Sequence, residues 1–109
     1  MPFSEPTADL LRADLGVEPG LTEKKMFGGL AFLLHGNMVC GVIKDGAMYR
    51  VGKANEAQAL ALGAGPMTFT GRKMGGMVEL DAGQLHDAAL RRTLTEFSLA
   101  NAASLPPKG

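Results

Sequence analysis

Hydrophobic and polar positions follow two different periods along the chain, and this separates helical from extended segments. Within residues 5–15, Leu10, Leu11 and Leu15 recur at helical spacing and Gly16 follows them. Ser4 or Thr7 supplies a capping side chain at the start of this segment. A first helix is therefore predicted there. Helix-forming composition or the same spacing predicts two further helices, at residues 53–62 and 86–103.

Extended segments are marked by short apolar runs between turn-forming residues. Gly36-Asn37 and Asp45-Gly46 are pairs of residues that tolerate positive φ, and each pair predicts a tight hairpin turn. The predicted strands are residues 24–34, 38–44, 47–51, 67–70 and 77–80. The resulting order, α-β-β-β-α-β-β-α, indicates an α+β fold in which helices pack on a curved antiparallel five-stranded sheet.

The glycine pair Gly28-Gly29 interrupts the apolar run KKMFGGLAF, inside the first predicted strand. Glycine weakens a strand, so the pair is expected to bend the sheet, with a close approach by a partner strand or second subunit as the alternative. A phosphate cradle is a third interpretation, since bases adjoin this pair and its echo GRKMGG at residues 71–76. Neither stretch has the spacing of a known phosphate-binding motif. We therefore favour the bend.

Composition indicates one domain, residues 1–109, with residues 104–109 as a flexible tail. The single Cys40 and two histidines provide neither a disulfide nor a zinc set, so no metal is expected. No secretion signal or membrane-spanning run is present, and we expect a cytoplasmic protein that does not bind membranes. Seven methionines indicate a core of flexible side chains.

No known catalytic motif occurs in the sequence, so we expect neither enzymatic activity nor a cofactor. Cys40 lies in an apolar run and is expected to be a small buried hydrophobic residue. The alternative is a catalytic thiol, for which His35 and His86 are the candidate bases. Both histidines are expected at the surface, beside a turn and at a helix start.

Charge is unevenly spread although the net charge is zero. Residues 1–23 carry five acids and one base, whereas residues 24–73 carry seven bases and two acids. The bases either pair with the acidic first segment or form a patch for an anion or a nucleic acid. This possible patch consists of Lys24, Lys25, Lys44, Arg50, Lys53, Arg72 and Lys73.

A family resemblance rests on two blocks that span most of the chain after residue 20. Met26-Phe27-Gly28-Gly29 is followed downstream by a block with the pattern P-M-x-F-x-G-R. Together these blocks resemble the TfoX N-terminal domain of the TfoX/Sxy family. The motif residues are Met26, Phe27, Gly28, Gly29, Gly71, Arg72, Met74 and Gly76.

The resemblance implies a fold like that of type III secretion chaperones, with helices on a curved antiparallel sheet, and it implies a homodimer. The family's namesakes regulate natural competence and act with the cyclic-AMP receptor protein at promoters. It therefore implies a small, non-enzymatic cytoplasmic regulatory module that contacts an unidentified protein partner. The alternative function is direct nucleic-acid binding through the basic middle segment.

Overall fold

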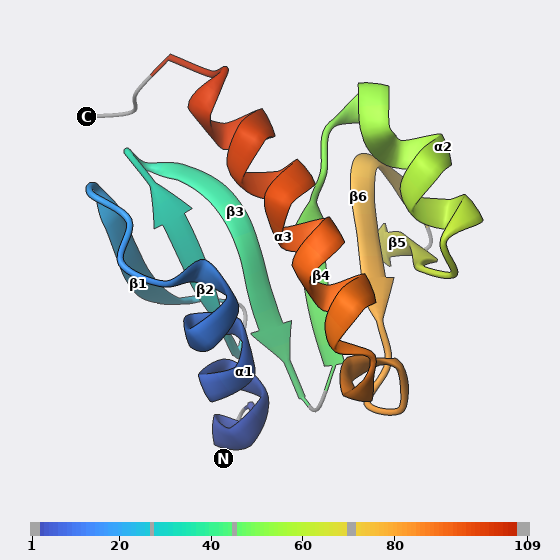
Figure 1. The fold of residues 1–109 in the computed structure, drawn as a ribbon, viewed down its shortest axis with the longest axis horizontal. Helices are drawn as coiled ribbons and strands as arrows, with labels where there is room; N and C mark the ends of the chain where they lie inside the picture. Colours follow the sequence, from blue (N-terminus) through green and yellow to red (C-terminus); the bar gives the residue numbers. More distant parts are fainter. Residues whose placement is uncertain (1–2, 27, 45, 70–71, 107–109) are drawn as a thin grey trace.

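A computed structural model of the chain describes residues 3–26, 28–44, 46–69 and 72–106. Within these residues three α-helices pack against a six-stranded antiparallel sheet (Figure 1). The helices are α1 (Glu5–Leu15), α2 (Lys53–Ala61) and α3 (Ala88–Ala103), with a 3-10 turn, η1 (Gln84–His86), before α3. The strands are β1 (Leu21–Met26), β2 (Gly29–Leu34), β3 (Asn37–Ile43), β4 (Gly46–Arg50), β5 (Gly65–Phe69) and β6 (Arg72–Leu80), in the spatial order β1-β2-β3-β4-β6-β5. The predicted α+β class is confirmed.

Capping side chains set the helix boundaries. The Ser4 hydroxyl accepts a hydrogen bond from the Thr7 amide, and α1 has the predicted bounds. The predicted helix at 86–103 begins later, at Ala88. Its start is determined by Asp87, whose carboxylate accepts from the Leu90 amide at 3.1 Å. The residues just before it form η1 instead.

The first predicted strand, residues 24–34, is wrong, because the chain reverses direction inside it. β1 and β2 run antiparallel, and Met26 lies opposite Gly29. Gly28, between them, has φ +75°, a left-handed conformation that glycine adopts without a steric penalty. Gly28 thus lies in a hairpin turn where a bend within one strand was predicted. The sheet has six strands as a result, not five.

The second glycine of the pair has a different role from the first. A Cβ on Gly29 would collide with the Val42 carbonyl oxygen of β3, so glycine lets these strands approach closely. This confirms the alternative interpretation for Gly29. Irregular registers occur elsewhere, between Phe32 and Leu33 and between Pro66 and Thr68. Bulges of this kind bend a sheet, which accounts for curvature without the glycine pair.

The two predicted turns are each displaced by one residue. His35 and Gly36 link β2 to β3, and both have positive φ, 51° and 84°, as a type I′ turn requires. Ile43 lies opposite Gly46, so the next turn precedes the predicted Asp45-Gly46 pair by one position. The echo at 71–76 was predicted as a connection, but from residue 72 onward it is the first half of β6.

The main core lies between the helices and one face of the sheet. Its fully buried members include Leu11 of α1, Leu94 of α3 and Phe32 of β2. Figure 1 shows α1 and α3 on this side of the sheet, with α3 in front of β3 and β4, while α2 packs against β6. At the C-terminal end, the Asn37 side chain donates to the Pro106 carbonyl at 2.9 Å, within the predicted tail.

Candidate interaction surface

The face of the sheet that points away from the helices carries most of the chain's methionines. Strand side chains alternate between faces, so Tyr49 of β4 points into the helix-covered core whereas its neighbour Met48 points the other way. We call this second surface the outer face. The strand registers and side-chain packing identify the residues at its centre, which are Ala31, Leu33, Met38, Gly41, Ile43, Met48, Met67 and Met77.

The methionines of the outer face shield one another. Met48, Met67 and Met77 are only 7%, 9% and 7% exposed and form a cluster separate from the main core. Met38 and Ile43 pack at its margin and are half-buried. Thioether side chains are flexible and polarizable, so such a surface can adjust its shape to a partner.

A concavity of about 460 Å³ opens at one end of the outer face. Met48 and Met67 form its apolar wall, and the strand glycines Gly46 and Gly65 leave room above the backbone. Charged residues also line it, Glu79 among them. This mixture of apolar and charged groups suits contact with another polypeptide better than a wholly apolar ligand.

A buried ion pair joins the helices on the opposite side of the sheet. The Arg91 guanidinium of α3 donates to Asp14 of α1 at 2.8 and 3.3 Å and to the Leu85 carbonyl at 2.8 Å. The two side chains are only 10% and 4% exposed. The hydrogen bond to Asp14 raises the pKa of Arg91 above its usual value. A cleft of about 310 Å³ between α1 and α3 lies over this pair.

Two polar groups of the sheet are buried beneath the same helices. Cys40 is fully buried, as expected, and burial raises the pKa of its thiol well above the usual value. A thiol in this state is a poor nucleophile. The Tyr49 side chain is also fully buried, and burial raises the pKa of its hydroxyl. His35 and His86 are both exposed, at a turn and in η1.

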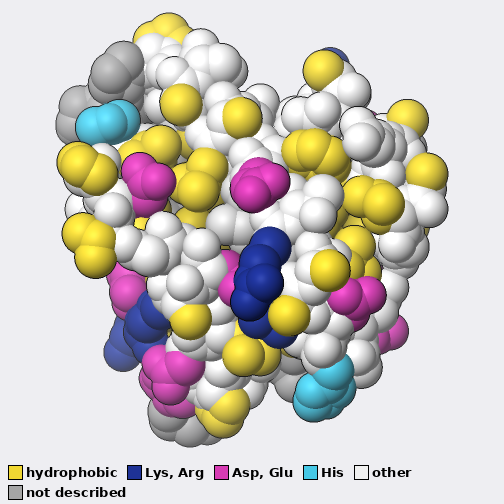
Figure 2. Space-filling view, viewed as in Figure 1, with side chains coloured by type: hydrophobic (Ala, Val, Ile, Leu, Met, Phe, Trp, Pro, Cys, Tyr) yellow, Lys and Arg dark blue, Asp and Glu magenta, His cyan; other side chains and the backbone are white. Residues whose placement is uncertain are grey.

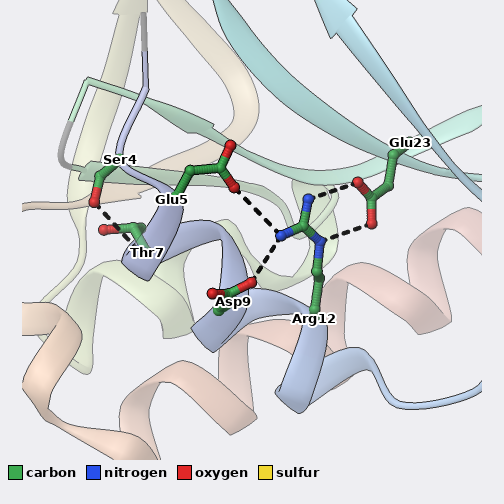
Figure 3. Close-up of polar contacts among 6 residues, drawn as sticks. All are labelled: Ser4, Glu5, Thr7, Asp9, Arg12 and Glu23. Carbon is green, nitrogen blue, oxygen red and sulfur yellow. Dashed lines mark hydrogen bonds and ion pairs between the residues drawn. The ribbon is translucent and has the colours of Figure 1, made fainter. Parts of the chain in front are cut away.

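An exposed network attaches α1 to the edge strand β1 (Figure 3). Arg12 donates to both carboxylate oxygens of Glu23 at 2.9 Å and to Asp9 at 2.8 Å, and Glu5 lies 3.6 Å away. The hydrogen bond from Arg12 lowers the pKa of Glu23. Part of the acidic first segment therefore pairs with its own Arg12.

Comparison with known families decides the classification. The TfoX N-terminal domain family matches residues 13–102. The chain belongs to the TfoX N-terminal domain family. No curated protein and no solved structure matches the chain. The resemblance drawn from the two sequence blocks is thus confirmed at the level of the family.

The described motif residues of this TfoX N-terminal domain shape the backbone. Gly28 lies in the β1–β2 turn, and Gly29 allows the backbone of β3 to approach closely because it has no Cβ. Gly76 of β6 has φ +79°, and its amide donates to Glu56 of α2 at 2.9 Å. Its carbonyl accepts from the Gly52 amide at 3.0 Å, which holds the start of α2 against β6. Phe27, Gly71 and the side chains of Arg72 and Met74 lie outside the described residues.

The predicted basic residues are distributed over several parts of the TfoX N-terminal domain. Lys24 and Lys25 are consecutive on β1, so their side chains point to opposite faces. Lys44 lies at the β3–β4 turn, whereas Arg50 ends β4 at its other end and Lys53 begins α2. The side chains of Arg72 and Lys73 lie outside the described residues. On the side drawn in Figure 2, basic side chains lie beside acidic ones and form no continuous patch.

The sequence reasoning did not identify the outer face or the Asp14–Arg91 pair. The outer face had a weak signal, because each of the five predicted strands contains a methionine, but only the registers show that most of them share one side. No sequence signal connects Asp14 to Arg91, which are 77 positions apart. Among the described residues, no cluster of potential metal ligands and no helix able to cross a membrane is found.

Proposed function

We propose that this TfoX N-terminal domain is a small regulatory module that acts by protein–protein contact, as a homodimer, through its outer face. It would work in the cytoplasm, without catalysis, in the regulation of transcription such as that of competence. The observation that carries the proposal is the methionine cluster on the outer face, opposite the face on which the described helices pack. Family membership supports the regulatory setting.

The state of the other reactive groups supports a non-enzymatic role. The chain's single thiol is buried with a raised pKa, and the two histidines are exposed on separate connections. The concavity at one end of the outer face combines the apolar Met48 and Met67 with charged residues such as Glu79. These features favour a binding surface over a reaction centre.

Analytical ultracentrifugation over a range of concentrations tests the proposal. We expect a monomer–dimer equilibrium for the natural chain. Met38→Glu places a charge on the outer face and should abolish the dimer, because a carboxylate would have to be desolvated in the interface. Leu62→Glu is the matched control, since Leu62 is 47% exposed at the end of α2, away from the outer face. A chain that stays monomeric at every concentration overturns the homodimer.

Direct nucleic-acid binding stays a prediction of the charge pattern. To test it, the binding constant for DNA is measured at several salt concentrations. Its logarithm should fall with the logarithm of the salt concentration, with a slope of about −0.9 for each phosphate contacted. A charge-reversed Lys24→Glu/Lys44→Glu variant should bind more weakly if the middle segment is responsible. Absence of binding at low salt would exclude this function.

A further inference from the structure

One straight row of side chains crosses the outer face at right angles to its strands. The registers connect Lys24 to Ala31, Ala31 to Gly41, Gly41 to Met48 and Met48 to Glu79. Each step moves one strand across the sheet, about 4.8 Å, so the charged ends of the row lie roughly 19 Å apart. We call this set the cross-strand row.

The cross-strand row is self-complementary in charge. Lys24 stands at one end and Glu79 at the other, and both are exposed. The three residues between them are uncharged and buried. Gly41 is the middle member, with no side chain of its own, and a Cβ there would be 2.8 Å from Cε of Met48. A second copy of the row, reversed and laid over the first, would bring each lysine over a glutamate.

We propose that two copies of the chain pack outer face to outer face about a two-fold axis that runs parallel to the strands over Gly41. This axis reverses the cross-strand row, so Lys24 of each copy faces Glu79 of the other. Met38 and Ile43, both half-buried, lie on the strand beneath the axis. Each therefore contacts the same residue of the other copy, in the apolar centre of the interface. Arg50, the charged residue of β4, also lies on this face and then packs over the strand that carries Leu33.

The alternative face-to-face dimer has its axis along the row, and charge opposes it. That axis would place Lys24 of one copy over Lys24 of the other. The two Glu79 side chains would meet in the same way, so the dimer would contain two repulsive contacts. Association through the sheet edges is also hindered. β1 presents charged side chains at one edge, and β5 carries Pro66, which has no amide hydrogen to donate, at the other.

The size of the face indicates how tight the dimer is. Five strands and five residues along each span about 19 by 14 Å between backbone centres, or roughly 400 Å² with the outer side chains included. Specific interfaces usually bury about 800 Å² per partner, so we expect a dimer of micromolar affinity. Rim charges such as Lys24 and Glu79 would then determine its register more than its strength.

Charge reversal tests this geometry, which rests on the homodimer of the proposed function. Lys24→Glu or Glu79→Lys alone should weaken the dimer about tenfold at low salt, since each creates two like-charge contacts. An equimolar mixture of the two variants should form heterodimers of natural affinity, because both contacts become complementary again. Lys25→Glu is the matched control, one residue away on the opposite face, and should leave the dimer unchanged.

Cross-linking supplies a second, independent readout. In the Lys24→Cys/Glu79→Cys variant the two introduced thiols are roughly 19 Å apart within one chain, too far for an internal disulfide. The proposed geometry brings them to about 10 Å between chains, the spacing of stacked sheets. A short thiol-specific bismaleimide should therefore give a covalent dimer, whereas Lys25→Cys/Glu79→Cys should give none. Circular dichroism verifies that each variant is folded.

The outcomes separate the two proposals. If the natural chain dimerises but charge reversal has no effect and no cross-link forms, the face-to-face geometry is wrong and the homodimer stands. If the natural chain is monomeric at all concentrations, both fall. Rescue in the mixture of single variants, together with the specific cross-link, establishes the axis over Gly41.

Discussion

The two faces of the sheet bury their side chains to a similar degree by different means. On the helix-covered face, Tyr49 and its neighbours are enclosed by α1 and α3 and become fully buried. On the outer face, Met48 and two further methionines are 7–9% exposed and pack in a separate cluster with no helix among its members. The first arrangement fixes each side chain by close packing, whereas the second can rearrange. Low exposure therefore does not by itself distinguish the helix-covered core from the cluster on the outer face.

The ion pair beneath the helices should give the largest effect. Asp14→Ala would leave the Arg91 guanidinium buried without its partner, and we expect the free energy of unfolding to fall by about 3–5 kcal/mol. Urea denaturation measures this loss. Asp9→Ala is the control, because Asp9 also pairs with an arginine but is 71% exposed, and its loss should stay below about 1 kcal/mol. Equal losses would contradict the structural role of Asp14.

Truncating one buried side chain on each face tests the comparison directly. Leu94→Ala removes a fully buried side chain under the helices and should cost about 3–4 kcal/mol. Met48→Ala on the outer face should cost about 1–2 kcal/mol, because neighbouring methionines and water can fill the space. Both losses are measured by urea denaturation of the monomer, at a concentration where no dimer forms. Equal losses would mean that the outer face is packed as rigidly as the core.

The paired glycines should respond unequally to alanine. In Gly29→Ala the new methyl group meets the Val42 carbonyl oxygen, and the strands must separate at an expected cost of about 2–3 kcal/mol. Gly28→Ala has open space but a φ of +75°, so only the backbone penalty of about 1 kcal/mol applies. Thermal denaturation of the two variants compares them. A larger loss at Gly28 would contradict the close strand approach.

The surface network that joins α1 to β1 should give the smallest effect, and it depends on pH. The pKa of Glu23 is lowered in the folded state by Arg12. The contribution of ionised Glu23 to the free energy of unfolding is therefore complete above its unfolded-state pKa of about 4.3. This contribution is lost as the pH falls through the lower pKa of the folded state. Solvent reaches both side chains, which are 37% and 41% exposed, so we expect the pair to contribute a few tenths of a kcal/mol. Glu23→Gln should remove this part of the acid sensitivity, as measured by unfolding at pH 3 and pH 7.

Local signals in the sequence were sufficient for the features that depend on neighbouring residues. The bounds of α1 follow from Ser4 and Gly16, and the α+β class follows from the alternation of strand and helix patterns. The apolar run of Cys40 was enough to predict its burial. The two sequence blocks were specific enough to indicate the family. Caps, turns and periodic patterns act within a few residues, so one chain read alone reveals them.

Only the tertiary structure decided the features that depend on register. The hairpin at Gly28, the sixth strand and the contact of Gly29 with Val42 depend on which strand lies beside which. The alignment of Lys24 with Glu79 requires four successive strand pairings, and no local pattern encodes their sum. A shift of one residue in any pairing would move a whole strand's side chains to the other face. The methionines could thus be counted in the sequence, but their common surface is a property of the folded sheet.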